Sequence, residues 1–319
     1  MSRFDVTVAG ELNLDLILYG LPESLPREQE ILVPEMLLTL GSSSAIVAHN
    51  LASLGCSVGF SSCVGIDRFG DVALDALSAA GVEVSTVRRL GGEIKTGLTV
   101  ILPHGAWRNI VTYMGAISAL QPEHLDLEYL RSSRHFHLSS YYLQRGLRPH
   151  IPELFQRLKS AGLTISLDTN DDPDDLWDSD LQKALAFVDV FLPNEREAMK
   201  IARCDSLEPA LTQMAKLVPL VVVKLGAQGA IAACGGEILR CARTRVDHVA
   251  DTVGAGDSFD AGFLSEFVNG ASLEACLRKG NLAGALSITR PGGIEAFRDV
   301  AYRECFLREH MLKGEGTYA

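Results

Sequence analysis

The residues with the clearest chemical potential lie between positions 250 and 263, where two glycines and an acid precede an amphipathic helix. The helix is predicted by three phenylalanines that recur every fourth position: Phe259, Phe263 and Phe267. Gly254 and Gly256 stand at its entrance, where glycine lets the backbone approach a ligand closely. The free N–H groups of a first helical turn, with the helix dipole, form an anion site. Asp257 follows in that same turn.

This combination of an acid and an anion site is what phosphoryl transfer requires. Asp257 can accept the proton of an attacking hydroxyl, while the N–H groups of Gly254, Ala255 and Gly256 stabilise the transferring phosphate. The alternative is that Asp257 only caps the helix or complements its dipole. A GxGxxG dinucleotide fingerprint would need glycine where Phe259 stands, and no GxxxxGK[ST] sequence occurs.

Composition excludes several classes of function. The 319 residues include 29 Lys plus Arg and 40 Asp plus Glu, a formal net charge of −11 that repels nucleic acid. The seven cysteines are never spaced as CxxC, so we expect neither disulfides nor a zinc site, and we predict a cytoplasmic protein. Residues 36–66 carry no charge, but glycines, serines and a histidine interrupt them, so we expect buried protein and no membrane segment.

These residues must be positioned by a fold, and the fold class follows from the alternation of short apolar runs with stretches of helical period. The runs predict strands at residues 4–9, 58–64, 134–139, 163–168, 188–192, 220–225 and 230–234. Such alternation is typical of a three-layer α/β/α fold with a mostly parallel central sheet. Ligands of these folds bind at the carboxyl edge of the sheet. Asp168 ends one run, so we expect its carboxylate to face that cleft.

Two segments break the alternation, and turn formers divide each of them into shorter runs. Residues from about 12 to 40 and from about 93 to 115 predict antiparallel strands outside the main sheet. We expect these strands to form a small β lid over the ligand cleft. The whole chain, residues 1–319, is therefore predicted to be a single domain that carries this lid.

The segment around Asp257 resembles the ribokinase-like (PfkB) carbohydrate kinases. Their signature, DTxGAGDxFxxG, is matched in order by Asp251, Thr252, Gly254, Ala255, Gly256, Asp257, Phe259 and Gly262. Further similarities follow in the family's order over roughly residues 4–298. The resemblance implies an ATP-dependent kinase that phosphorylates a hydroxyl of a sugar or sugar-like molecule, with Asp257 as the base.

The resemblance also assigns residues to the two ends of the site. The stretch at 10–15 is similar to the family's first-strand exit, which implies that Asn13 and Asp15 bind sugar hydroxyls near Gly41. Asn194 and Glu197 match the NxxE element that is linked to magnesium, although Glu197 could instead be a simple first-turn acid. Four further residues resemble the family's nucleotide side: Lys224, Gly226, Gly229 and Asn281. Asp251 resembles a ligand of the family's monovalent cation loop, which implies potassium.

Departures from the family concentrate at the acceptor end. The pattern GGxxxNxAxxLxxLG maps onto residues 41–55, with Ser42 for its second glycine and Ile46 for its asparagine, so an amide is lost from the pocket. Asp172 stands where many sugar kinases carry arginine, which argues against recognition of a negatively charged substrate group. We take Gly41, Ser42, Asp168 and the lid residue Arg108 as candidate acceptor contacts.

We therefore expect ATP, Mg²⁺ and a small sugar-like acceptor as ligands, and neither nucleic acid nor a membrane as a partner. The lid strands of such kinases often pair between subunits, so the resemblance also implies a homodimer. Two alternatives stay open at this point. One is a non-catalytic, ribokinase-like protein that senses a nucleotide or sugar, and the other is a kinase for a nucleoside or a vitamin precursor.

Overall fold

The computed structural model describes residues 2–105, 107–177 and 180–314, and its centre is an eight-stranded sheet. The strand order is β14-β13-β12-β11-β10-β9-β1-β4. The strands are β1 (Phe4–Ala9), β4 (Val58–Ser61), β9 (Ser133–Leu138), β10 (Thr164–Leu167), β11 (Val190–Phe191), β12 (Leu220–Lys224), β13 (Ala230–Cys234) and β14 (Glu237–Cys241). All neighbours pair in parallel except β12 with β13 and β13 with β14. The predicted, mostly parallel sheet is confirmed.

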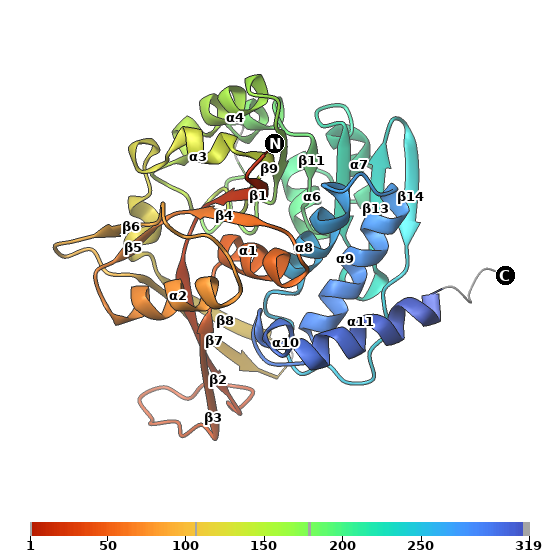
Figure 1. Ribbon diagram of the computed structural model, residues 1–319. Helices are drawn as coiled ribbons and strands as arrows, with labels where there is room; N and C mark the ends of the chain where they lie inside the picture. Colours follow the sequence, from red (N-terminus) through yellow and green to blue (C-terminus); the bar gives the residue numbers. More distant parts are fainter. Residues whose placement is uncertain (1, 106, 178–179, 315–319) are drawn as a thin grey trace.

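Helices cover both faces of this sheet because the strands alternate their apolar side chains between two cores. Phe136 on β9 packs with one group of helices: α3 (Leu127–Arg131), α4 (Ile151–Ser160), α5 (Asp180–Leu185), α6 (Glu195–Ala202) and α7 (Leu207–Met214). Val6 and Val8 on β1 pack with the other group: α1 (Ser43–Ser53), α2 (Arg68–Ala79), α8 (Ala255–Phe267) and α9 (Leu273–Ser287). The three-layer architecture is visible in Figure 1.

The remaining helices are short or peripheral. Helices α10 (Glu295–Arg298) and α11 (Val300–Gly314) pack on α9 through Phe297 and Phe306. Single 3₁₀ turns complete the connections: η1 (Gly115–Ala119), η2 (Pro122–His124), η3 (Arg148–His150) and η4 (Gly226–Gln228). Within the described ranges, no helix combines the length and the apolar character needed to cross a membrane.

A second sheet of four strands contains both predicted lid segments and projects from one side of the molecule (Figure 1). Its order is β3-β2-β7-β8, formed by β2 (Asn13–Tyr19), β3 (Glu35–Leu40), β7 (Gly97–His104) and β8 (Trp107–Tyr113). We call these four strands the lid. Each segment forms an antiparallel hairpin as predicted, but the inner strands β2 and β7 pair in parallel, which the sequence analysis did not predict. Two hairpins laid side by side with their inner strands in the same direction produce that pairing.

The predicted strand at 58–64 is divided in two. Strand β4 ends at Ser61, and β5 (Cys63–Gly65) leaves the main sheet to pair with β6 (Arg88–Leu90). Asp67, which follows β5, accepts hydrogen bonds from Gly70 N–H and from both the N–H and the hydroxyl of Thr96, at 2.8 to 2.9 Å. This turn therefore fixes the start of β7, and with it the inner half of the lid.

Candidate active site

The turn predicted from the glycines is present at the start of α8, and we call residues 254–257 the catalytic turn after the role expected of it. Gly254 has φ +71°, and a Cβ there would lie 2.6 Å from Cα of Gly293, so only glycine fits. The first helical hydrogen bond of α8 runs from Ser258 N–H to the Gly254 carbonyl. The amides from Gly254 to Asp257 therefore precede the intrahelical hydrogen bonds, as an anion site at a helix N-terminus requires, and Ala255 N–H donates to the Thr252 carbonyl at 3.4 Å. Gly256 is exposed, so the turn is open to a ligand.

Asp15 lies at the lid end of the same site. Its side chain is only 5% exposed, and Gly41 passes so close that a Cβ at Gly41 would overlap the carboxylate. Among the described residues, none donates a hydrogen bond to this carboxylate. Asn13 is also buried, but its amide donates to the Thr99 hydroxyl and the Leu14 carbonyl at 3.0 and 3.1 Å. Asp15 is thus the acceptor-end group whose hydrogen-bonding capacity is left for a ligand.

Both acids carry perturbed pKa values. Burial, with repulsion from Asp168 adding to it, raises the pKa of Asp257 to about 7. Burial and the nearby Asp257 likewise raise the pKa of Asp15 to about 7. The two carboxyl groups are therefore close enough to repel each other, and each titrates near neutral pH. A carboxyl group that titrates there is matched to work as a general base.

Lys224 lies beneath the catalytic turn, enclosed by two acids. Its Nζ is 2.7 Å from Asp168 Oδ2 and 3.0 Å from Asp260 Oδ2, and both acids are essentially unexposed. A Cβ at Gly256 would lie 3.7 Å from this Nζ. Burial opposes the charge of Asp168, yet Lys224 holds the pKa of that carboxyl below its ordinary value. Burial raises the pKa of Asp260 well above the ordinary value, so one of the two acids is charged and the other holds a proton.

Asn194 and Glu197 lie beside Lys224 at the start of α6. Asn194 caps the helix, and Glu197 accepts the Asn194 N–H at 2.9 Å, which forms a capping box. Burial, together with Asp168, raises the pKa of Glu197 to about 8. The position of Glu197 is compatible with both interpretations of the sequence. It is an acid in the first turn of α6, and it is also a buried carboxylate near Asp168 and Lys224.

The other predicted nucleotide-side residues form the loop between β12 and β13 and its support. Gly226 and Gly229 both have positive φ, and a Cβ at Gly229 would overlap the carbonyl of Cys241. Asn281 on α9 donates to the carbonyls of Cys241 and Ala242 at 3.2 and 3.1 Å. Asn281 therefore ties α9 to the segment that follows β14.

Arg108 does not join the other acceptor candidates. It extends from the exposed strand β8, and its Nη1 lies 3.4 Å from the Thr252 hydroxyl. Beside it, the Tyr19 hydroxyl donates to Asp251 Oδ2 at 2.7 Å. The lid thus contacts the main body at residues 251 and 252, immediately before the catalytic turn.

Three buried polar residues around the candidate site were not predicted as site residues. Glu11 is buried in the connection between β1 and β2 and accepts hydrogen bonds from Ser44 N–H, the Ser44 hydroxyl and Gln144. Asp260 was part of the signature segment but was not singled out; its spacing of one helical turn from Asp257 was the available signal. Asn50 donates to the Ser258 hydroxyl and the Gly293 carbonyl at 3.0 and 3.1 Å.

The departure at Ile46 is filled by apolar packing. Ile46 is buried and packs against Gly254 and Gly293, so an apolar side chain stands at the position of the family's asparagine. One turn further along α1, the amide of Asn50 is used within the fold, by Ser258, Gly293 and His49. Ser42 caps α1 with φ +61° and donates its hydroxyl to the Glu11 carbonyl at 2.9 Å, so its side chain is engaged in the fold.

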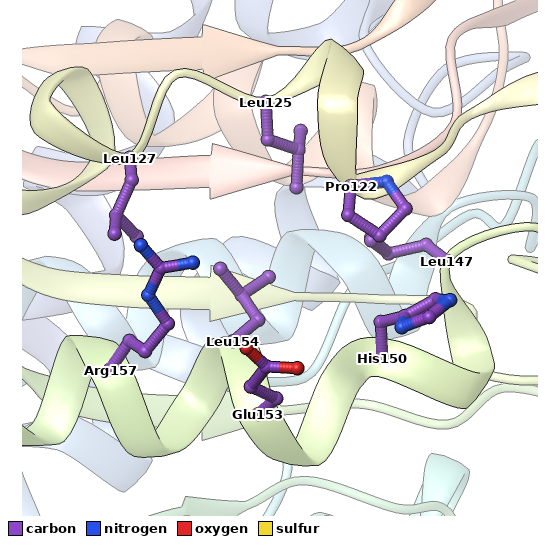
Figure 2. A pocket seen from close by; sticks show the side chains of 8 residues that line it. All are labelled: Pro122, Leu125, Leu127, Leu147, His150, Glu153, Leu154 and Arg157. Atoms are coloured by element: carbon purple, nitrogen blue, oxygen red, sulfur yellow. The ribbon is translucent and has the colours of Figure 1, made fainter.

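A hollow elsewhere on the molecule is unrelated to these residues. It lies between the η2 to α3 segment and α4, lined by apolar side chains with His150, Glu153 and Arg157 at its rim (Figure 2). None of the predicted site residues lines it. The candidate active site is therefore the cluster at the carboxyl edge of the sheet, where Asp15, Asp168, Lys224 and Asp257 meet.

Comparison with known proteins identifies the family of this chain. Residues 3–299 match the family described as pfkB family carbohydrate kinase. A 2-dehydro-3-deoxygluconokinase of Bacillus subtilis (strain 168) is 31% identical over 292 residues, covering 86% of this chain and 90% of that protein. Arabidopsis thaliana ribokinase complexed with ribose and ATP is 26% identical with a TM-score of 0.83, covering 97% of this chain and 99% of that one. A protein named ribokinase II from E. coli, in complex with ATP and Mg²⁺, is 25% identical with a TM-score of 0.84, covering 96% and 99%.

Fold and relatives together define an ATP-dependent carbohydrate kinase with a ribokinase-like fold. The chain belongs to the PfkB family. The predicted enzyme class is confirmed, in preference to the alternative of a non-catalytic sensor.

Proposed function

We propose that Asp257 is the general base of this kinase and that the amides of Gly254, Ala255 and Gly256 form its anion site. The observation that carries the proposal is the position of Asp257: buried in the first turn of α8, next to Asp15 and close to Lys224. Asp15 binds the acceptor hydroxyl, and Asn13, Gly41, Ser42 and Asp168 line that end, with the side chains of Asn13, Ser42 and Asp168 held by the fold. Arg108 approaches from the lid at Thr252.

In the proposed step, the acceptor oxygen attacks the γ-phosphorus of ATP in line. A new P–O bond forms, the bond to the β–γ bridging oxygen breaks, and ADP leaves with that electron pair. The hydroxyl proton passes to Asp257, while the three amides stabilise the charge on the transferring group. Positioning contributes more than basicity, because the proton leaves late in a loose transition state.

Magnesium is expected with ATP, and the residues near Glu197 fit it. Burial and Asp168 raise the pKa of Glu197 and favour its neutral form, and a cation nearby would favour its ionised form. Among the described residues, no group of three or more His, Cys, Asp or Glu could hold a metal by itself. Magnesium usually keeps waters and binds substrate phosphates, so we assign Glu197 a contact through water. When bound, the ion neutralises phosphate charge.

We further propose that the nucleotide lies along the β12 to β13 loop, bounded by Asn194, Lys224, Gly226, Gly229 and Asn281. Both glycines adopt positive φ, which lets the chain turn sharply in this loop. Asn281 hydrogen-bonds the Cys241 carbonyl at the end of β14. Lys224 is committed to Asp168 and Asp260, so it supports the catalytic turn from below.

Asp251 does not fit the potassium site that the resemblance implied. Its Oδ1 accepts the N–H groups of Thr252 and Val253 at 2.6 and 3.0 Å. Its Oδ2 accepts the Tyr19 hydroxyl at 2.7 Å and Gly292 N–H at 3.2 Å. These four donors occupy the lone pairs of the carboxylate. No step of the proposed mechanism uses potassium.

The proposal is tested by coupled ADP release with Mg²⁺, ATP and a panel of sugars, sugar acids, sugar phosphates and nucleosides. Turnover that depends on one acceptor, with a phosphorylated product detected by mass spectrometry, supports it. ADP release that is independent of any acceptor, without a phosphorylated product, contradicts it.

The pH dependence of the reaction should follow the two raised pKa values. Asp257 must be ionised to accept a proton, so we expect kcat/KM to fall by about tenfold per pH unit below pH 7, and more steeply if Asp15 must also be ionised. A flat profile from pH 5 to 8 would contradict the assignment. Both pKa values lie above the ordinary 3.8, so these groups stabilise the fold as the pH falls through this range. Melting temperatures across the profile therefore separate protonation of the base from unfolding.

We propose that the lid forms a homodimer interface. Its edge strand β8 exposes four large side chains by 54 to 78%: Trp107, Ile110, Val111 and Tyr113. An exposed apolar edge strand is a surface that pairs with another chain. We expect the protein to sediment as a dimer and Ile110→Glu to sediment as a monomer. Ile238→Glu, on the exposed edge strand β14, is the matched control; dimers in both variants, or a monomeric wild type, would contradict the lid interface.

A further inference from the structure

Three acids converge on the acceptor end of the site: Glu11, Asp15 and Asp257. Each is at least nine-tenths buried. Burial is the largest influence on Asp15, and repulsion from Asp257, Asp251 and Glu11 then adds to it and raises the pKa of Asp15 further. No cation is among these influences. The charged groups that act on Asp15 are therefore all acids, whereas Lys224 acts on Asp257.

Asp15 is the acid prepared for a ligand. Glu11 is satisfied by Ser44 and Gln144, at 2.6 to 3.2 Å. Within the described part of the chain, no group donates a hydrogen bond to the carboxylate of Asp15, although this residue is only 5% exposed. A buried acceptor without a partner is costly, and hydroxyl groups of a ligand would supply the missing donors. A carboxylate or phosphate on the ligand would supply no donor and would add repulsion.

The buried cation of the site already forms ion pairs within the protein. Lys224 is held by Asp168 and Asp260. Asp172, at the position where many sugar kinases carry arginine, accepts the N–H groups of Asp174, Leu176 and Trp177 at 3.1, 2.9 and 2.8 Å. That side chain therefore fixes its own loop and offers no positive charge to a substrate.

Arg108 lies on the far side from Asp15. On the lid, Asp15 pairs with Thr99 of β7, whereas Arg108 pairs with Pro103, four residues further along the same strand. At about 3.3 Å per residue this separation is about 13 Å along the strand. The guanidinium instead reaches Thr252, before the catalytic turn. Arg108 thus contacts the segment before the catalytic turn and not the surroundings of Asp15.

From this arrangement we infer that the acceptor is an uncharged polyol, a neutral sugar or sugar alcohol, and neither a sugar acid nor a sugar phosphate. The inference rests on the proposed function, because it places the acceptor at Asp15. It separates this chain from its 31% identical relative, whose name specifies an acid as substrate. The specificity-determining features are the unpartnered Asp15 and the carboxylate at position 172.

The test uses matched acceptors that differ in charge: fructose and fructose 6-phosphate, ribose and ribose 5-phosphate, mannitol and mannonate, with 2-dehydro-3-deoxygluconate added. Product is measured directly by mass spectrometry and ADP by coupled assay, with the full chain, Mg²⁺ and ATP. Juxtaposed like charges cost several kcal/mol, so we expect the best uncharged acceptor to exceed its anionic partner by at least about 100-fold in kcat/KM.

Two variants make the result specific. Asp15→Asn should lower kcat/KM for the uncharged acceptor and narrow the ratio between uncharged and anionic acceptors. Arg108→Gln should leave that ratio unchanged, whereas loss of activity on anionic acceptors alone would identify Arg108 as an anion-binding residue and overturn the inference. Preference for an anionic acceptor overturns it while the kinase mechanism stands. If no uncharged polyol is turned over, the inference is wrong; if no acceptor at all gives a product, the proposed function fails with it.

Discussion

Replacement of Asp257 by asparagine is expected to lower kcat by at least about 100-fold, the scale that general base catalysis contributes. The amide keeps the shape of the side chain but cannot take the proton of the attacking hydroxyl. The catalytic turn depends on Gly254 and its contact with Gly293, which the substitution does not touch. ATP should therefore bind the variant with an affinity close to that of the wild type, as isothermal titration calorimetry can measure.

Stability provides an independent check on the Asp257 variant. Burial disfavours the charged form of Asp257 and raises its pKa to about 7. At pH 8 the wild type therefore carries a buried charge that asparagine lacks, so Asp257→Asn should melt no lower than the wild type. Glu266→Gln makes the same chemical change later in α8, on a part-exposed side chain, and should leave kcat unchanged. Turnover in Asp257→Asn within a few-fold of wild type would reject the general base.

Much of this arrangement could be predicted because it depends on local patterns. The recurrence of Phe259 and Phe263 predicted a helix, and α8 is present, but it is buried on all sides from Asp257 to Ser265 and not along one stripe alone. Asp168 ends an apolar run, and the carboxyl ends of parallel strands meet at one edge, so its place at that edge of the sheet follows from chain order alone. The lid segments were visible from turn formers and alternation. These inferences require no knowledge of which distant residues touch.

What could not be predicted depends on long-range pairing. The parallel contact between β2 and β7 joins hairpins about 80 residues apart, and neither hairpin specifies its neighbour. Lys224 was placed near the nucleotide, but its two acidic partners are 56 and 36 residues away, and only the packing of α8 on the sheet brings them together. Ile46 showed that an amide was missing, but the hydrogen bond of Asn50 to Ser258 depends on how α1 packs against α8, which the sequence does not specify.

Lys224 is the second residue whose replacement should have a large effect, and that effect is on folding. Removing one partner of a buried ion pair leaves an uncompensated charge, which costs about 3 to 5 kcal/mol in free energy of unfolding. Asp168 is 1% exposed and Lys224 11%, so water cannot replace the lost partner. We expect Lys224→Met to lose about 3 kcal/mol or more in urea unfolding at pH 7. The exposed pair of Lys200 with Asp175 gives the matched control, since solvent screens that pair and Lys200→Met should lose far less stability than Lys224→Met.

The two acids beside Lys224 should respond differently, because they carry one proton between them. Burial raises the pKa of Asp260 well above the ordinary value, so at neutral pH it resembles the asparagine of Asp260→Asn, and that variant should lose far less stability than Lys224→Met. Asp168 is the charged partner, so the double variant with Lys224→Met and Asp168→Asn should recover part of the loss by removing the unpaired charge. If Lys224→Met costs no more than Lys200→Met, the buried pair does not hold the catalytic turn in place. If Asp168→Asn worsens the loss, Asp260 is the charged acid and the assignment of the shared proton is reversed.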